Sequence, residues 1–257
     1  MSWKWPLALF GIGLIAKGDA FSATVNYNNQ SASVFHFSLI NETSPLNTFL
    51  GNPNGANGSP IPFASTDNSG VDFLRFLPSA NLSVAAAGNP SVSYASSKFS
   101  FHISSPSNAF ITDLRITLGG TYNINSLPLP SDRASIYLDT SVFIEAFGNL
   151  GSVPAGPTKT ASYRFPAQEW TLPTVGAANW SIEWNANLAS IFSAPTMDVT
   201  KINFSITPDI VLLAENFGSG SLFLNQLTVA VIPEPSTASL VLLGLIPLLR
   251  RRGAKSR

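Results

Sequence analysis

The sequence predicts an all-β fold, an antiparallel β-sandwich with a jelly-roll-like body, from three observations. Residues 21–232 are rich in Ser, Asn, Thr, Gly, Pro and Phe and poor in Lys and Glu, a mixture that favours strands and turns over helices. Several segments alternate apolar and polar residues with a period of two, the pattern of half-buried strands. Gly-, Asn- and Pro-rich segments separate them, and many short strands with turns between them are typical of sandwiches.

Candidate strands in the first half of the chain follow the positions of Phe, Leu and Ile. In residues 33–40, Phe35, Phe37 and Leu39 are two apart and are therefore expected on one face. Residues 98–104 show the most regular alternation in the chain. The other strands expected before residue 150 are residues 23–28, 71–77, 112–118, 121–125 and 135–147.

The strand expected over residues 135–147 differs from the others in its polar face. This face carries three aromatic residues, Tyr137, Phe143 and Phe147. Because large aromatic side chains are usually buried, we expect this strand to be covered on both faces.

Glycine and proline mark the positions where strands are expected to turn or end. Gly119 and Gly120 lie between two alternating segments and predict the two-residue turn of a hairpin. Pro208 is expected to end the strand before it, since proline has no N–H for a β-ladder. Beyond residue 158 the expected strands are residues 160–165, 170–172, 180–187, 198–207 and 221–231, and a short helix is expected over residues 187–192.

The sandwich body is assigned to residues 21–232, a length that one domain can hold. The loop over residues 148–158 is the candidate boundary if the body instead consists of two smaller sandwiches. The chain has no cysteine, so the body must rely on its hydrophobic core, and catalysis or metal binding by thiols is excluded.

The N-terminus has the three parts of a secretory signal peptide. Lys4 precedes an apolar stretch over residues 6–16, and the small residues Gly18 and Ala20 follow it. This pattern predicts a cleavable signal helix over residues 1–20, with cleavage after Ala20. The chain is therefore expected to enter the Sec export machinery.

The C-terminus combines an extended motif, an apolar segment and a basic cluster. Pro233, Glu234 and Pro235 come first, residues 236–249 carry no charge, and the cluster consists of Arg250, Arg251 and Arg252. Fourteen helical residues reach only about 21 Å, against a hydrocarbon core of about 30 Å. The segment therefore predicts a short hydrophobic helix that holds the chain in the inner membrane temporarily, with the arginines on the cytoplasmic side. The two prolines are expected to keep the motif out of helix and sheet.

This order of parts over residues 233–257 resembles the PEP-CTERM sorting signal. The resemblance implies that an exosortase, a membrane-embedded cysteine enzyme, processes the chain near the Pro-Glu-Pro motif. It implies delivery to the cell surface or the extracellular space. It also implies an association with exopolysaccharide and biofilm, because the family is associated with both, while the bodies of its members are diverse.

The charge of the body argues against nucleic acid as a partner. The whole chain has 14 basic and 14 acidic residues, but without residues 1–20 and 233–257 the body has a net charge near −5 and no basic run. Nucleic-acid binding needs a positive surface. Mild acidity instead suits a soluble surface protein.

No motif of an enzyme is recognised in the body, and the chain is predicted not to be one. His36 and His102 do not form a ligand-spaced pair, and zinc needs three or four ligands. Single carboxylates that could serve polysaccharide hydrolysis are scattered along the chain, at Asp72, Asp113, Asp139, Glu145, Glu169 and Glu183. No cofactor is predicted, although a turn with Asp67 and Asp72 at its ends offers oxygen ligands of the kind that calcium takes.

Trp180 and Trp184 are the aromatic residues that most resemble a binding site. On a strand they share one face, and two exposed, coplanar indole rings would form a platform for sugars, whereas buried rings would pack the core. The leading hypothesis is an exported, structural or adhesive protein of the cell surface or matrix. The alternatives are a carbohydrate-binding module that uses the two tryptophans, and a secreted polysaccharide hydrolase.

Overall fold

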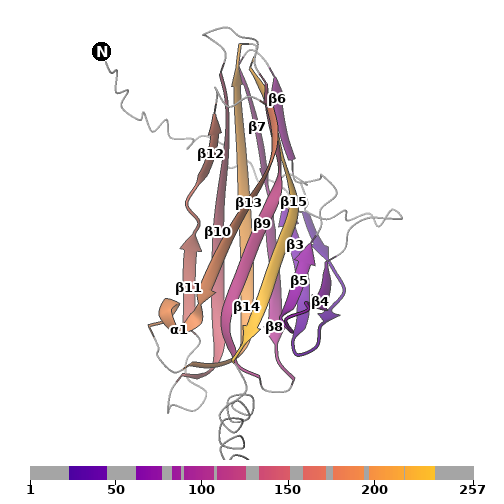
Figure 1. Cartoon of the computed structure of the whole chain (residues 1–257), viewed down its shortest axis with the longest axis vertical. Helices are drawn as coiled ribbons and strands as arrows, with labels where there is room; N and C mark the ends of the chain where they lie inside the picture. The colour runs from indigo at the N-terminus through magenta and orange to yellow at the C-terminus, as the bar shows by residue number, and fades with distance from the viewer. Residues whose placement is uncertain are drawn as a thin grey trace, which may run out of the picture.

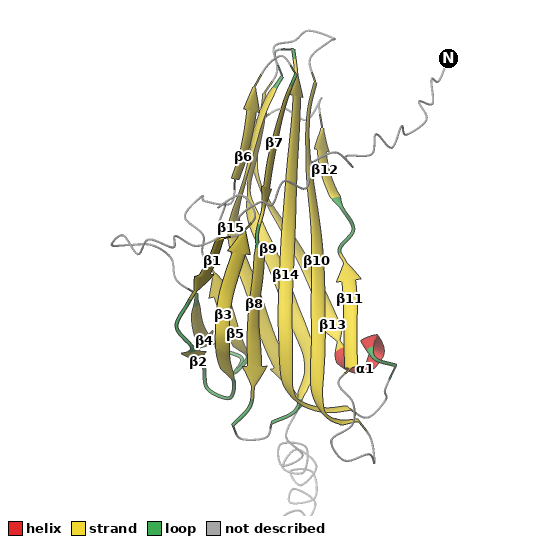
Figure 2. Cartoon of the chain, turned by 180° about the vertical axis from the view of Figure 1, so that it is seen from behind, coloured by secondary structure: helices red, strands yellow, loops and turns green. Residues whose placement is uncertain are grey.

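The predicted all-β class is confirmed by the structure. The computed structural model describes residues 23–44, 62–76, 83–87, 90–106, 109–125, 133–150, 159–171, 176–193, 197–216 and 218–234. These residues form two antiparallel sheets, arranged as in a β-sandwich, with the strands along the long axis (Figures 1 and 2). The predicted signal helix and C-terminal helix lie outside the described residues. Within the described residues, no helix has the length and apolar character needed to span a membrane.

The larger sheet has nine strands, and its long central strands are β14 and β10. The path β1-β3-β8-β14-β10-β11 is formed by β1 (Ala23–Asn26), β3 (His36–Ser44), β8 (Lys98–Ser104), β14 (Met197–Glu215), β10 (Arg133–Leu150) and β11 (Lys159–Arg164). Three further strands join it: β2 (Gln30–Ser31) pairs with β3, β7 (Ser91–Ser96) with β14, and β12 (Gln168–Thr171) with β10.

The smaller sheet has six strands and the order β13-β9-β15-β5-β4. These are β13 (Gly176–Asn187), β9 (Ile111–Asn125), β15 (Ser219–Pro233), β5 (Asp72–Phe76) and β4 (Phe63–Thr66), and β6 (Ser83–Ala87) pairs with β15. In both sheets, strands from beyond residue 150 lie between strands from before it. The predicted short helix is present as α1 (Leu188–Ile191), capped by the Asn187 side chain, which accepts a hydrogen bond from the Ser190 amide.

The core forms because one face of each strand turns toward the opposite sheet. On β8, Phe99, Phe101 and Ile103 are buried, as their spacing predicted. Phe101 lies 5.0 Å from the ring of Phe204 on β14, and Phe99 lies 4.8 Å from Phe76 of the other sheet. The inward-facing residues of the two sheets form one hydrophobic cluster, so each sheet buries the inner face of the other.

A β-bulge in β3 changes which residues of this strand face inward. Phe35 and Phe37 are buried as predicted, but Leu39 is 61% exposed and Ile40 is buried instead. Leu39 has a φ of 51°, and the register with β8 shifts between Ser38 and Asn41. A bulge inserts one residue, so every later side chain moves to the other face. The prediction that Leu39 shares the buried face was therefore wrong.

The predicted hairpin turn at Gly119 and Gly120 is absent. Both glycines lie inside the continuous fifteen-residue strand β9. They face a bulge in β15, where the register shifts between Leu224 and Gln226, and a Cβ on Gly120 would lie 1.9 Å from the Phe223 carbonyl oxygen. The glycines thus allow close approach of two backbones, the other common role of glycine in strands.

Two prolines lie within strands where the sequence predicted an end. Pro208 continues β14 opposite Thr140 of β10, at the point where the other neighbour of β14 changes from β8 to β7. A residue without an N–H is tolerated at such an interruption of the ladder. Pro233 is the last residue of β15, and the Glu234 amide donates to the Phe110 carbonyl at 2.9 Å. Pro233 is therefore part of the sheet, contrary to the prediction, and Glu234 follows directly after its last residue.

The bulge in β3 reverses which side chains of this strand face inward, and it thereby also places a carboxylate inside the sandwich. Glu42 is fully buried, and it accepts hydrogen bonds from the Tyr27 hydroxyl at 2.9 Å and from the Ser97 hydroxyl. Burial, followed by the charge of Glu42 and the hydrogen bond to it, raises the pKa of Tyr27 far above its ordinary value of 10.0. The buried pair therefore requires a protonated tyrosine.

We expect this pair to make the fold sensitive to alkali. The folded pKa of Tyr27 lies above the unfolded one, so the stabilisation is complete below pH 10.0 and is lost as the pH rises above it. Between about pH 9 and about pH 11, the melting temperature of the wild type should fall more steeply than that of Tyr27→Phe. Parallel pH profiles of the two proteins would contradict the assignment.

Candidate binding site

Trp180 and Trp184 contribute to an aromatic seam along one side of the sandwich. Trp180 is only 8% exposed and lies 5.6 Å from the ring of Trp170 on β12. Trp184 stacks on Tyr163 of β11, with ring centroids 4.2 Å apart and planes within 4°. These rings join β13 of the smaller sheet to β11 and β12 of the larger one. The two tryptophans therefore pack the seam and do not form an exposed, coplanar platform.

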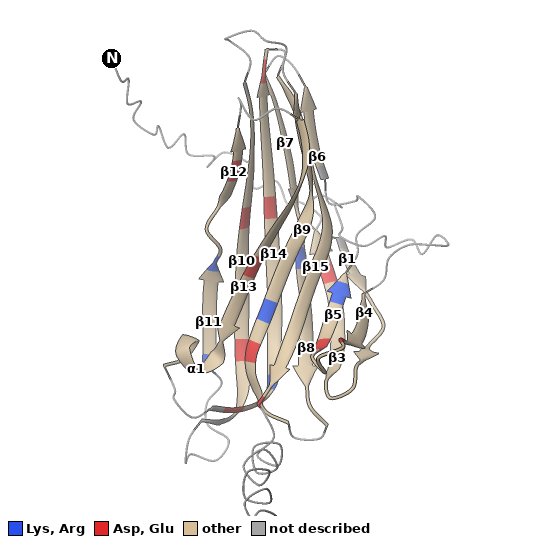
Figure 3. Ribbon diagram, in the orientation of Figure 1, with Lys and Arg blue, Asp and Glu red and all other residues tan. Residues whose placement is uncertain are grey.

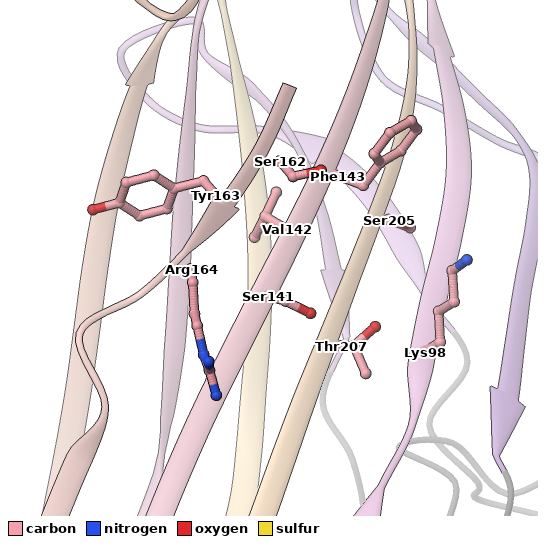
Figure 4. A pocket seen from close by; sticks show the side chains of 9 residues that line it. All are labelled: Lys98, Ser141, Val142, Phe143, Ser162, Tyr163, Arg164, Ser205 and Thr207. Carbon is pink, nitrogen blue, oxygen red and sulfur yellow. The ribbon is translucent and has the colours of Figure 1, made fainter. Parts of the chain in front are cut away.

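The outer face of the larger sheet carries an open groove instead. It has a volume of about 530 Å³ and is formed by β8, β14, β10 and β11 (Figure 4). Most of its polar side chains are short hydroxyls. The lining residues are Lys98, Ser141, Val142, Phe143, Ser162, Tyr163, Arg164, Ser205 and Thr207. We call this feature the outer groove.

Cross-strand pairing explains why the sheet is hollowed here. Ser141 of β10 lies opposite Thr207 of β14 on one side and opposite Arg164 of β11 on the other. Phe143 is the next residue on this face and lies between Ser205 and Ser162 in the same way. Side chains in such rows share one face of a sheet. Small residues thus form the floor, and longer side chains form the borders.

Phe143 is the aromatic group that this groove offers to a ligand. Its side chain is 40% exposed, so the outer face of β10 is not covered at this position, contrary to the expectation for residues 135–147. The sequence had placed Phe143 on the polar face of this strand, together with Tyr137 and Phe147. The pattern alone could not decide whether another layer covers it.

A second, smaller hollow adjoins the outer groove. It has a volume of about 170 Å³, and Lys98, Phe143 and Ser205 line both features. The exposed Leu39 borders this hollow, and no pattern in the sequence had pointed to that role. Its other lining residues are Asn41, Ser100, Phe101, His102, Asn203 and Phe204. We call it the side hollow.

The charges around these hollows are mixed. Arg164 forms a bidentate ion pair with Asp139 of β10, which leaves further guanidinium N–H groups for a ligand. Lys98 is exposed at the opposite border. Figure 3 shows that both acidic and basic residues occur on the strands. The face therefore suits a ligand that is recognised by hydroxyl groups more than by net charge.

The two histidines of the chain lie on adjacent strands of the larger sheet, His36 on β3 and His102 on β8 opposite Ser38. His36 is exposed, with Nδ1 2.6 Å from the Ser31 hydroxyl. His102 lies in the side hollow, where desolvation, followed by the positive charge of Lys201, lowers its pKa, while Glu145 acts in the opposite direction. A lowered pKa keeps the imidazole neutral at neutral pH, with one donor and one acceptor nitrogen. In the described parts of the chain, no group of three His, Asp or Glu side chains could hold a metal ion.

The carboxylates considered for hydrolysis interact with neighbouring side chains. Asp139 and Asp209 are direct cross-strand neighbours, and Asp209 accepts a hydrogen bond from the Tyr94 hydroxyl at 3.0 Å. Neither of these two lines the outer groove. Asp113 accepts from Asn187, Glu145 from Asn203, Glu183 from Asn185, and Glu169 from Tyr137. These carboxylates therefore serve as hydrogen-bond acceptors for neighbouring side chains of the protein.

The two calcium candidates also accept hydrogen bonds from the protein. Asp67 accepts from the Ser69 amide and hydroxyl and from the Val71 amide, which lowers its pKa and closes the turn. Asp72 is 1% exposed and accepts from Thr66 and from three amides of the segment before β3. Lone pairs that accept these donors are not free for a cation.

The predicted sorting and cleavage residues are only partly within the described structure. Pro233 and Glu234 lie at the end of β15, as given above. Ala20, Pro235, Arg250, Arg251 and Arg252 lie outside the described residues. The motif therefore begins directly at the edge of the folded body.

Comparison with known proteins gives only distant likenesses. No family model and no curated protein matches the chain. A solved structure of TmCBM61 in complex with β-1,4-galactotriose is similar over 77% of this chain and 90% of that one, with 11% identity and a TM-score of 0.22. The enzymatically active domain of tailspike protein 4 from bacteriophage CBA120 is similar over 82% of this chain and 19% of that one, with 9% identity and a TM-score of 0.20. Likenesses this weak assign no ligand to this chain.

Proposed function

We propose that this chain is an exported, non-enzymatic protein of the cell surface or matrix that adheres to exopolysaccharide. The outer groove is the contact surface of the body. The observation that carries this proposal is the exposed ring of Phe143 above a floor of Ser141, Ser162, Ser205 and Thr207. Sugar rings present apolar faces and many hydroxyls, so an aromatic ring beside short hydroxyls is a complementary surface.

The dimensions of the groove also fit an extended polymer. It spans four neighbouring strands, from Lys98 on β8 to Arg164 on β11. Three steps between strands amount to about 14 Å, enough for a few sugar units laid across the sheet. An open groove lets a long chain enter and leave at both ends, as a polysaccharide requires.

The two ends of the chain carry the proposed route of delivery. A signal peptide cleaved after Ala20 opens the export pathway, and the tail that resembles a PEP-CTERM signal is processed by an exosortase near Pro235. Mass spectrometry of the protein recovered from the cell surface or the medium tests this route. We expect an N-terminus at Phe21 and a C-terminus close to the Pro-Glu-Pro motif. An intact chain from Met1 to Arg257 in the cytosol would contradict it.

Phe143→Ala tests the binding function of the body. We expect the full chain to bind polysaccharide extracted from the producing cells, and the variant to bind about tenfold more weakly, equal to about 1.4 kcal/mol. Isothermal titration or a co-sedimentation assay measures the change. Phe63→Ala is the matched control, since Phe63 is 36% exposed but lies on the other sheet. Equal binding by the wild type and both variants would contradict the assignment of the outer groove as the binding site.

A further inference from the structure

Leu39 combines two features that a stable fold normally avoids. Its φ of 51° lies in the left-handed region, where a bulky side chain is unfavourable. Its side chain is also 61% exposed, so the residue gains little from burial. Glycine or asparagine would adopt this backbone with less strain. Neither conformation nor packing explains a leucine at this position.

The surrounding side chains hold Leu39 in this conformation. The Asn29 side-chain oxygen accepts a hydrogen bond from the Leu39 amide at 3.1 Å, and the Asn41 side-chain amide donates to the Leu39 carbonyl at 2.9 Å. These contacts fix the bulge on both sides of the residue. Bulges often re-aim a side chain at functional sites, and backbone strain held by its surroundings is a reason to look for function.

The re-aimed side chain borders the side hollow. Leu39 and Phe143 are the two exposed apolar groups that line it. Ser100 and His102 supply polar groups from β8, and Asn203 supplies them from β14. His102 is held neutral by a lowered pKa, so its imidazole can donate one hydrogen bond without bringing a charge. The hollow thus offers apolar and hydrogen-bonding groups within about 170 Å³.

We propose that the side hollow takes an acetyl substituent of the polysaccharide that the outer groove holds. The methyl group packs against Leu39 and Phe143, and the carbonyl oxygen accepts a hydrogen bond from Ser100 or His102. A bare hydroxyl would leave Leu39 without an apolar partner, whereas an acetyl group pairs with both kinds of surface. This inference rests on the proposed function, and it specifies which substituent of the polysaccharide the protein recognises.

The test compares neutral glycans with and without acetyl groups. Chitin oligosaccharides carry an acetamido group at C2 where cello-oligosaccharides of equal length carry a hydroxyl. Acetylated glucomannan before and after mild alkali differs in O-acetyl groups. In at least one of these two pairs, we expect the full chain to bind the acetylated glycan about tenfold more tightly than its unacetylated counterpart. Leu39→Gly should lose this preference while its melting temperature stays equal or rises, because glycine relieves the strain.

Val92→Ala is the matched control, because Val92 is 68% exposed on β7 of the same sheet and does not line the hollow. It should keep the preference. Binding without any preference, or a preference that survives in Leu39→Gly, would overturn the inference and leave the proposed function intact. If neither these oligosaccharides nor the extracted polysaccharide binds, the proposed function fails and this inference fails with it.

Discussion

Gly120→Ala is expected to destabilise the protein by about 3 kcal/mol or more, the upper range for overpacked interiors. The added Cβ would lie 1.9 Å from the Phe223 carbonyl oxygen and 3.0 Å from Cε2 of Trp180. A backbone oxygen cannot move aside as a side chain can, so β9 and β15 would have to separate. For a domain of this size the melting temperature should fall by about 6–12 °C, measurable by circular dichroism.

Gly119→Ala is the matched control on the neighbouring residue. Its Cβ would meet the Trp180 carbonyl oxygen at 3.4 Å, an ordinary contact, and we expect a change within about 1 kcal/mol. The pair also distinguishes the continuous strand from a hairpin. A two-residue hairpin turn usually requires positive φ at its glycines, so both substitutions would then be costly. Similar losses in the two variants would argue against the strand.

Asp72→Asn is expected to have an effect of similar size, about 3 kcal/mol, because a buried donor left without an acceptor costs about 1–3 kcal/mol. The buried carboxylate of β5 accepts amide hydrogen bonds from Val34 at 2.6 Å, Phe35 at 2.8 Å and Ser33 at 3.2 Å, and a fourth from the Thr66 hydroxyl. It thereby ties the segment before β3 to the opposite sheet. Asparagine brings an NH₂ group toward these donors, which leaves buried N–H groups unsatisfied.

Chemical denaturation measures the loss, with Asp67→Asn as the control. Asp67 closes an exposed turn, and the side-chain oxygen of asparagine can accept the same hydrogen bonds from Ser69 and Val71. We therefore expect the control to unfold close to the wild type. If Asp72→Asn also unfolds close to the wild type, Asp72 does not tie the two sheets together.

Local patterns predicted strands well wherever the alternation is uninterrupted. Residues 98–104 coincide with β8, and the apolar residues of that segment are all buried. The Asn187 cap of α1 is likewise a local effect, since the side chain bonds an amide three residues away. Predictions failed where one residue had two structural uses. Glycine can form a turn or admit a close backbone, and Gly120 does the latter.

The candidate site was less accessible to sequence reasoning than the fold. Trp180 and Trp184 have the residue type expected of a sugar platform, but the opposite sheet edge covers them through Trp170 and Tyr163. Phe143 has the exposure that the tryptophans lack. Alternation states which side chains share a face, and it carries no information on what packs against that face.

The sequence by itself determined the all-β class, the period of most strands and the character of the outward side chains. The tertiary structure decided which outward face stays open, where a bulge reverses the phase of β3, and how Pro208 continues β14. The physical reason is the separation along the sequence between the residues that interact. Strand period and capping depend on neighbours a few residues apart, whereas the covering of Trp184 and the exposure of Leu39 depend on strands brought together from distant parts of the chain.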